Sequence, residues 1–383
     1  MKRIASSMAT ALVIAATGAS AGPAEASHVE CGDEITADTT LDGDLLDCES
    51  NGIVIGADDI TLDLDGHLID GDAAEDMTCA KEEICDVGIV LDGHDGVTVK
   101  GGTVREFGVG VLVVKGSGSS FNRVRTTRNT FSGVILFKSE RTTLRHHLFR
   151  ANGLETDQAG ITVIKTSKLR IAQSEMRDNG DIGLYGEDSE GSKIVDNEIA
   201  GNPEAGILMS GSRMLFARNR LDRNGDGIAT GGSHITIRNN FITRSQRCGA
   251  HCGLGIQVEE GSGNRIVGNL VEDVDTTGIS VAGYGPVKHV FVAHNTVRGA
   301  GEDAFRVKSV FEPVSHVTLR HNHALGARAD GFDVSVDLTR LHDNEANGNG
   351  DLGIEAAGGV IDAGGNRASG NGDARQCVNV RCG

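Results

Sequence analysis

Short stretches in which aliphatic residues alternate with other residues recur along almost the whole chain. A phrase of the form Gly-aliphatic-x-aliphatic returns every 21 to 28 residues, and its first residues are Gly88, Gly110, Gly133, Gly160, Gly183, Gly206, Gly227, Gly255, Gly278, Ala304, Gly331 and Gly353. Alternation with a period of two predicts strands that turn one face toward a core. Self-similarity at a mean spacing of about 24 residues predicts a solenoid, in which each repeat adds one coil.

A second phrase, x-aliphatic-x-x-Asn-x-aliphatic, lies between successive copies of the first. Its asparagines are Asn197, Asn219, Asn240, Asn269, Asn295, Asn322, Asn344 and Asn366. Asparagine at a fixed turn can satisfy backbone groups that would otherwise be buried without partners. Each repeat therefore has at least two short strands and one fixed turn, and we expect the asparagines to stack in a ladder.

A leucine-rich repeat is the rival interpretation of this pattern. Residues 235–242 fit its L-x-L-x-x-N-x-L frame, and the periods overlap. The remainder of a leucine-rich repeat is helical, whereas here 255–258 and 278–281 alternate as strands do. The sequence therefore predicts an all-β, single-stranded right-handed parallel β-helix of about 13 coils.

Composition agrees with one long rod. The 383 residues include 54 glycines but only 4 prolines, which excludes collagen and low-complexity disorder. Aromatic residues make up 3% and tryptophan is absent, so thin layers of aliphatic side chains must fill the core. Many of the glycines begin a coil, where the chain has to turn tightly.

The N-terminus has the pattern of an export signal. Lys2 and Arg3 precede an apolar stretch around 11–16 and small residues at 19–21, which predicts a secretory signal peptide over 1–21. We expect an N-terminal cap over 22–51, the β-helix over 52–383, no membrane span, and a secreted location, extracellular or in the cell envelope. The net charge of −18 argues against nucleic acid as a partner.

Eight cysteines fall in four close pairs. They are Cys31 with Cys48, Cys79 with Cys85, Cys248 with Cys252, and Cys377 with Cys382. Close even pairing in an exported chain predicts local disulfides, the first and last of which would pin the two caps. The alternative for Cys248, His251 and Cys252 is a zinc clip that lacks a fourth ligand.

These motifs resemble the right-handed parallel β-helix repeat proteins of the pectate-lyase-like superfamily, nearest to NosD-like secreted members. The resemblance covers nearly all residues after Gly52. It implies polysaccharide chemistry on the outward strand face, and for NosD-like proteins an association with copper. The chain departs from polygalacturonase-like members because Asp303, Arg306 and Lys308 crowd into one strand. It also lacks the Tyr and His with Asp signature of alginate epimerases.

The outward position of the repeated strand becomes charged toward the C-terminus. We predict catalytic residues among Asp303, Arg306, Lys308, Asp330 and Asp333. Stacked carboxylates would hold Ca²⁺, with a basic side chain as the proton acceptor of a lyase or epimerase. Two aspartates would alternatively serve as acid and base in glycoside hydrolysis. A third interpretation is a charged ladder that only solubilises this face.

Other residues near this face are candidates for binding substrate. The long insertions at 245–254, 284–286 and 310–313 flank the charged coils and would wall a groove. The predicted substrate-binding residues are Gln257, Glu259, Tyr284, Phe311 and Glu355.

Toward the N-terminus the same outward column is apolar. An exposed apolar stripe usually has a cover or a partner. Either the segment 71–87 folds over it, or the rod self-associates through the stripe around Leu112, Ile135 and Phe137.

Two further clusters carry possible chemistry. Between Lys115 and Arg150 there are eight basic residues and one acid, which would bind an acidic glycan or be balanced by acidic neighbours.

His294 and His321 each precede a ladder asparagine, and Asp343 follows in the same position. This set would hold Zn²⁺ or Cu²⁺, or be a stack of turn residues without a metal.

Together these observations predict an exported β-helix that binds or processes polysaccharide. Any catalysis would be of lyase or glycoside hydrolase type, with calcium as a possible cofactor. The alternatives are a non-catalytic surface or adhesion rod and a NosD-like metal-handling module.

Overall fold

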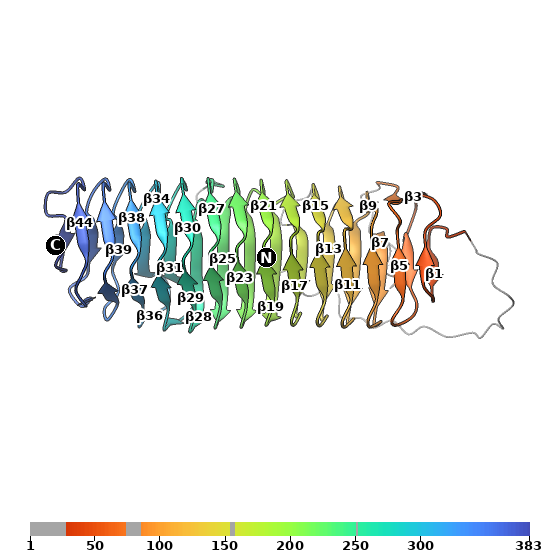
Figure 1. Ribbon diagram of the computed structural model, residues 1–383, viewed down its shortest axis with the longest axis horizontal. Coiled ribbons are helices and arrows are strands. Elements are labelled where there is room, and N and C mark those ends of the chain that lie inside the picture. Colours follow the sequence, from red (N-terminus) through yellow and green to blue (C-terminus); the bar gives the residue numbers. More distant parts are fainter. Residues whose placement is uncertain (1–27, 74–85, 154–157, 250–251) are drawn as a thin grey trace.

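The computed structural model describes residues 28–73, 86–153, 158–249 and 252–383. These residues form a straight rod of stacked coils, in which three parallel sheets run along the whole length (Figure 1). Two of these sheets, named B and C below, contain 14 strands each, so the described rod has one coil more than predicted. The described part contains no helix, and so none that would be long and apolar enough to cross a membrane. The predicted signal peptide lies outside the described residues.

Sheet A contains the strands of the Gly-aliphatic phrase. Its members are β1 (Asp33–Ile35), β4 (Ile53–Ile55), β7 (Val87–Asp92), β10 (Val109–Val114), β13 (Ser132–Phe137), β16 (Ala159–Ile164), β19 (Ile182–Glu190), β22 (Ala205–Ser212), β25 (Asp226–Ser233), β28 (Ile256–Ser262), β31 (Ile279–Gly283), β32 (Val287–Lys288), β35 (Phe305–Ser309), β36 (Val314–Ser315), β39 (Phe332–Val334), β42 (Ile354–Ala356) and β45 (Cys377–Val378).

Sheet B follows sheet A in each coil. Its members are β2 (Thr39–Thr40), β5 (Thr61–Asp63), β8 (Thr98–Lys100), β11 (Ser120–Asn122), β14 (Thr143–Arg145), β17 (Arg170–Ala172), β20 (Lys193–Val195), β23 (Leu215–Ala217), β26 (Thr236–Arg238), β29 (Arg265–Val267), β33 (Phe291–Ala293), β37 (Thr318–Arg320), β40 (Arg340–His342) and β43 (Ile361–Asp362).

Sheet C completes the coil. Its members are β3 (Leu45–Cys48), β6 (Leu68–Gly71), β9 (Thr103–Arg105), β12 (Arg125–Thr127), β15 (Leu148–Arg150), β18 (Glu175–Arg177), β21 (Glu198–Ala200), β24 (Arg220–Asp222), β27 (Phe241–Thr243), β30 (Leu270–Glu272), β34 (Thr296–Arg298), β38 (His323–Leu325), β41 (Glu345–Asn347) and β44 (Arg367–Ser369).

The register of sheet A confirms the predicted central outward column. Leu112 lies opposite Val90 on one side and Ile135 on the other, and the same phase continues to Asp333 opposite Glu355. The alternate residues point inward and form one core along the rod. Within each sheet, neighbouring strands lie about 4.8 Å apart, so outward side chains of successive coils are close neighbours.

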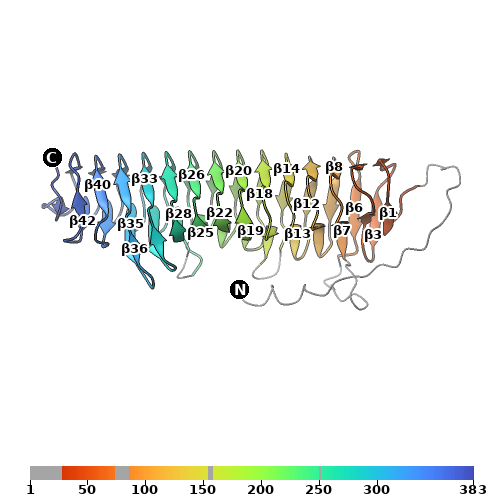
Figure 2. The same cartoon turned by 90° about the horizontal axis from the view of Figure 1, so that it is seen from below.

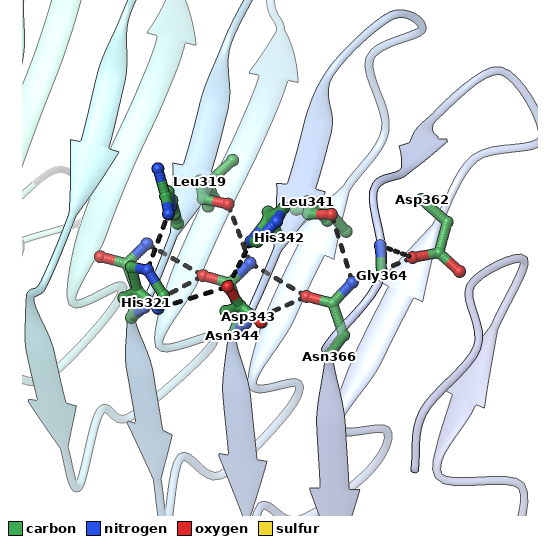
Figure 3. A network of polar contacts seen from close by, with 11 residues as sticks. Leu319, His321, Leu341, His342, Asp343, Asn344, Asp362, Gly364 and Asn366 are labelled. Atoms are coloured by element: carbon green, nitrogen blue, oxygen red, sulfur yellow. Dashed lines mark hydrogen bonds and ion pairs between the residues drawn. The ribbon is translucent and has the colours of Figure 1, made fainter.

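The predicted asparagine ladder occupies the turn between sheets B and C (Figure 3). The side-chain amide of Asn344 donates to the Leu319 carbonyl at 2.9 Å and to Asn366 Oδ1 at 3.2 Å. The backbone N–H of Asn344 donates to the same oxygen of Asn366 at 3.0 Å. Each ladder amide therefore satisfies a backbone carbonyl and a backbone N–H of the preceding coil and bonds to the next asparagine of the ladder, so buried turn groups find partners as the sequence predicted.

A second asparagine ladder, which the sequence analysis did not identify, occupies the turn between sheets C and A. Its members are Asn129, Asn152, Asn179, Asn202 and Asn224, and near the C-terminus Asn349 and Asn371. Both turns that flank sheet C are thus held by buried side-chain amides.

Three of the predicted disulfides are confirmed. They join Cys31 to Cys48, Cys248 to Cys252, and Cys377 to Cys382. The disulfide at Cys248 replaces the alternative of a zinc clip. Cys79, Cys85 and His251 lie outside the described residues. Residues 33–48, inside the predicted cap, form a coil of their own that stacks on the next one.

The apolar N-terminal stripe is buried in its central column, whereas Phe137 beside it is half-buried. Val90, Leu112 and Ile135 are 5%, 7% and 3% exposed and form a cluster separate from the main core. The segment that we expected to cover them includes 74–85, which lies outside the described residues. Self-association through this stripe stays a prediction.

Candidate functional site

Two groups of polar side chains lie on the outward face of sheet A, between β19 and β42. The first lines a hollow over β19, β22, β25, β28 and the turn after β31, which we call the central groove. The second, the C-terminal cluster, consists of Asp303, Arg306, Asp330, Asp333 and Glu355, over β35, β39 and β42.

The central groove has a volume of about 350 Å³. Its lining residues are Tyr185, Gly186, Glu187, Leu208, Met209, Ser210, Gly231, Glu259, Glu260, Tyr284 and Gly285. Of the predicted substrate-binding residues, only Glu259 and Tyr284 are among them. The lining includes three carboxylates and no lysine, arginine or histidine.

Irregular pairing in two strands builds this groove. In β19 the register shifts between Gly186 and Ser189, so Glu187 and Asp188 lie opposite the single residue Ser210 and β19 has one extra residue. In β28 the register shifts again, and Gly231 lies opposite Glu260. Glu259 is therefore an extra residue, which a bulge inserts between the paired residues Val258 and Glu260. Bulges re-aim side chains and are frequent beside functional sites.

Two aromatic rings stand at the rim of the groove. The Glu259 carbonyl accepts the backbone N–H of Tyr284 at 3.0 Å, and the Gly283 carbonyl accepts that of Phe311 at 2.9 Å. These turns bring the rings to a centroid distance of 5.7 Å at an angle of 66°. Tyr284 is 48% and Phe311 79% exposed. Near β36, the connection that carries Phe311 projects beyond the body of the rod (Figure 2).

Burial makes the carboxyl groups in and beside the groove weaker acids. Burial, and secondarily the charge of Glu260, raises the pKa of Glu259. Asp226, which begins β25, is buried more deeply, and burial raises its pKa to about 7. Its Oδ1 accepts the backbone N–H of Leu254 at 2.9 Å. Tyr185 donates a hydrogen bond to Glu187, and burial together with this bond raises the Tyr185 pKa.

The pKa of Asp226 predicts that stability falls as pH rises from 6 to 8. The unfolded state releases this proton near pH 4 and the folded state near pH 7, so folding is progressively disfavoured between these values. We expect Asp226→Asn to remove roughly 1 kcal/mol of this loss between pH 6 and pH 8. Thermal unfolding at both pH values measures it. Asp273→Asn, at an exposed turn, should lose as much stability between pH 6 and pH 8 as the wild type does. Equal losses in the two variants would refute the assignment.

In the C-terminal cluster, Arg306 is held by acidic neighbours. Its guanidinium lies 2.7 Å from Asp303, 3.0 Å from Glu302 and 3.8 Å from Asp333. Asp303 also accepts the backbone N–H of Asp330 at 3.1 Å. Burial lowers the pKa of Arg306, but the Asp303 and Glu302 carboxylates outweigh this and raise it above its ordinary value. Arg306 therefore does not fit the predicted role of a base, and Asp303 holds the coils together.

Asp330 and Asp333 have raised pKa values, as acid–base groups do. Burial, the charges of Asp303 and Glu355, and hydrogen bonding to Glu355 raise the pKa of Asp330 to about 7. Its Oδ1 accepts the Leu352 backbone N–H at 2.8 Å. Burial and then the charge of Asp303 raise the pKa of Asp333. Burial thus brings the pKa of Asp330 close to neutral pH, and the exposed side chain of Glu355 lies beside it.

The remaining predicted residues are spread over the same face. Gln257 lies between Ala229 and Ser280 in the central column and is 5% exposed. Lys308 is exposed and lies opposite Ala282. Glu355 belongs to the C-terminal cluster and does not line the groove. The predicted binding set is therefore not one site: part of it lies in or at the rim of the groove, Glu355 belongs to the C-terminal cluster, and Gln257 belongs to neither.

The predicted histidine stack is present at the turn between sheets B and C. The rings of His294 and His321 lie 4.9 Å apart and 23° from parallel. Asp343 contacts His321 at 3.7 Å and also contacts His342 (Figure 3). Within the described ranges, no three His, Cys, Asp or Glu side chains are grouped so as to hold a metal ion. Zinc, copper or calcium binding stays a prediction.

Comparison with solved structures finds similar rods in phage tailspikes. A tailspike of E. coli bacteriophage HK620 in complex with pentasaccharide superposes with a TM-score of 0.57 at 11% identity, covering 91% of this chain and 74% of that one. Its hexasaccharide complex gives 0.54 at 12% identity, covering 91% and 73%. The Dettilon tailspike gives 0.51 at 18% identity, and the match covers 72% of this chain but only 57% of the tailspike.

Sequence comparisons give the family. No curated protein matches the chain. The family described as "Right handed beta helix region" matches residues 87–242 and 211–335, which together are more than half of the chain. The periodic phrases, the three parallel sheets and this match agree, and the chain belongs to the right-handed β-helix family.

Proposed function

We propose that this protein binds a polysaccharide in the central groove and hydrolyses a glycosidic bond at the C-terminal cluster. The observation that carries the proposal is the acidic groove with Tyr284 and Phe311 at its rim, on the same sheet face as Asp330, whose pKa burial raises to about 7. The HK620 tailspike, which shares the fold, has been solved with oligosaccharides, and this supports the class of ligand. The predicted export signal would bring the protein to polysaccharides outside the cytoplasm.

The groove offers sugar residues both aromatic surface and hydrogen-bond acceptors. Aromatic rings such as Tyr284 and Phe311 offer flat apolar area with little rotational freedom, against which the C–H face of a sugar ring can lie. The carboxylates of Glu187 and Glu259 can accept hydrogen bonds from hydroxyl groups. A linear chain lying along the rod would pass from the groove to the C-terminal cluster, because both are on sheet A.

The C-terminal cluster supplies the two roles that hydrolysis requires. Asp330, whose pKa of about 7 leaves part of it protonated at neutral pH, would donate its proton to the glycosidic oxygen as the bond to the sugar carbon breaks. Asp333 or Glu355, as the carboxylate, would take a proton from the water whose oxygen forms the new bond to that carbon. Both roles use groups of the chain and need no calcium.

Hydrolysis is favoured over elimination because Arg306 is occupied by carboxylates. A lyase needs a base that removes a proton next to a uronate carboxylate. Arg306 keeps its proton, which leaves the exposed Lys308 as the remaining basic candidate in the predicted set. The three carboxylates of the groove would also repel a polyuronate.

Incubation with neutral and acidic polysaccharides, with and without Ca²⁺, tests this proposal. We expect new reducing ends without unsaturated products. Asp330→Asn should lower kcat by about 10²- to 10⁴-fold with little change in binding, because Asn can still accept the Leu352 N–H. Calcium-dependent unsaturated products would overturn hydrolysis in favour of a lyase. Binding without turnover would leave a non-catalytic binding rod.

Truncating the rim tests the groove separately. Tyr284→Ala or Phe311→Ala should weaken oligosaccharide binding about tenfold by removing a stacking surface. Titration calorimetry with the best-bound oligosaccharide measures this. Ile361→Ala removes a side chain that is 40% exposed near the C-terminus and should have no effect. Unchanged binding in both rim variants would show that the groove is not the binding site.

A further inference from the structure

Three lysines stack on successive coils at the turn from sheet A to sheet B. Lys115 donates its backbone N–H to Phe137 O at 2.9 Å, and Lys138 donates to Ile164 O at 2.9 Å. These bonds place Lys115, Lys138 and Lys165 at the same position of three neighbouring coils, which follow β10, β13 and β16. All three have φ values between 52° and 57°, and all three side chains are exposed. We call them the lysine row.

The lysine row is not neutralised by the described part of the chain. None of its ammonium groups forms an ion pair with a described carboxylate, whereas some charged residues of other turns pair across neighbouring coils. Arg218, for example, makes two 2.7 Å hydrogen bonds to Asp196 on the preceding coil. The backbones of neighbouring coils lie about 4.8 Å apart, and like charges on neighbouring coils repel each other, so the row does not stabilise the fold.

Two further cations lie beside the lysine row. Arg141 and Lys168 occupy equivalent positions of neighbouring coils, three residues after Lys138 and Lys165. They share one acid, Glu140, at 2.9 Å from each. Five positive charges therefore face one negative charge on this edge, in a protein whose net charge is −18.

A strip of partly exposed apolar side chains borders the row on the other side. Val114, Phe137 and Ile164 immediately precede the three lysines and lie in register across β10, β13 and β16. The Lys138 ammonium lies 4.9 Å from the centre of the Phe137 ring. The row of lysines thus lies beside a parallel apolar strip that is one residue wide, and both run along the rod.

We propose that the lysine row and its apolar strip bind an anionic polysaccharide, carboxylated or sulfated, that lies parallel to the rod axis. A linear polymer can place its acidic groups along the row and the C–H faces of its rings on the strip. The row ends at Asp188 on the next coil, beside the acidic central groove, so this ligand is confined to the coils of β10, β13 and β16. This site is independent of the proposed hydrolase activity.

A flat anionic membrane fits this edge less well than a single polymer chain. Screening in physiological salt acts over about 8 Å, so a polymer on the row would be shielded from most of the acidic rod. A bilayer would extend over that acidic surface and be repelled by it. Vesicle binding therefore serves as the competing outcome of the test.

Binding of the full-length protein to dextran sulfate, polygalacturonate and uncharged dextran tests the proposal. We expect binding of at least one anionic polymer and none of dextran. The combined variant Lys115→Gln, Lys138→Gln and Lys165→Gln should bind about tenfold or more weakly, and with a smaller salt dependence, because fewer counterions are released. Gln173 already adopts the same backbone conformation, so glutamine is compatible with these turns.

Two controls make the result specific. The variant Arg238→Gln, Arg340→Gln and Arg367→Gln removes the same charge from exposed sites elsewhere and should bind as the wild type does. Tyr284→Ala, which tests the central groove, should also leave this binding unchanged. Equal loss in the lysine and arginine variants, absence of binding to both anionic polymers, or lysine-dependent binding only to phosphatidylglycerol vesicles would overturn the proposal.

Discussion

Replacing Asn219 by alanine should lower the free energy of unfolding by about 3–5 kcal/mol. Asn219 is 1% exposed in the middle of the ladder between sheets B and C. Its Oδ1 accepts the backbone N–H of Asn197 at 3.1 Å, and its Nδ2 donates to the Ile194 carbonyl at 2.9 Å. Alanine leaves both buried backbone groups without a partner, and each unpaired group costs about 1–3 kcal/mol.

The residue before the next ladder asparagine provides the matched control. Asn239 is exposed, has a φ of 55°, and precedes Asn240. Asn239→Gly keeps this backbone conformation accessible and should change stability by less than about 0.5 kcal/mol. Chemical denaturation followed by circular dichroism compares the two variants. Similar losses in both would mean that the ladder amides contribute no more than exposed ones.

The periodic part of this molecule could be predicted from its sequence because each coil repeats the same physical constraint. A buried aliphatic position and a buried turn amide recur at fixed phase, so strands, central column and one ladder followed from spacing alone. The second ladder was not predicted because its asparagines, such as Asn152 and Asn179, follow sheet C in loops of varying length. Their spacing to the next Gly-aliphatic phrase is constant only in part of the chain, which hid the pattern.

The central groove was predicted poorly because it arises where the repeat is broken. The bulges at Glu187 and Glu259 insert residues and shift the outward phase, so a column extrapolated from regular strands misplaces them. Asp226 was missed in a different way. It begins a coil three residues before the central column, where the register cannot reveal a raised pKa. An acid in a column that holds mostly apolar residues, and that also includes Asp303 and Asp330, was the available signal.

Replacing Gly232 by alanine should be the most destabilising of these changes, with a loss of more than about 4 kcal/mol. Gly232 has a φ of 118° and stacks between Gly211 and Gly261, and a Cβ there would lie 1.9 Å from the Gly211 carbonyl oxygen. The coils cannot move apart locally without breaking the hydrogen bonds that join β22, β25 and β28. Because these strands form the floor of the central groove, we also expect oligosaccharide binding to be lost. Gly348→Ala is the control, since Gly348 has a φ of 65° but no atom within 4 Å of the added Cβ. It should cost only about 1–2 kcal/mol of backbone strain. If thermal unfolding showed equal losses in the two variants, the close approach of the coils at Gly232 would not be what selects glycine there.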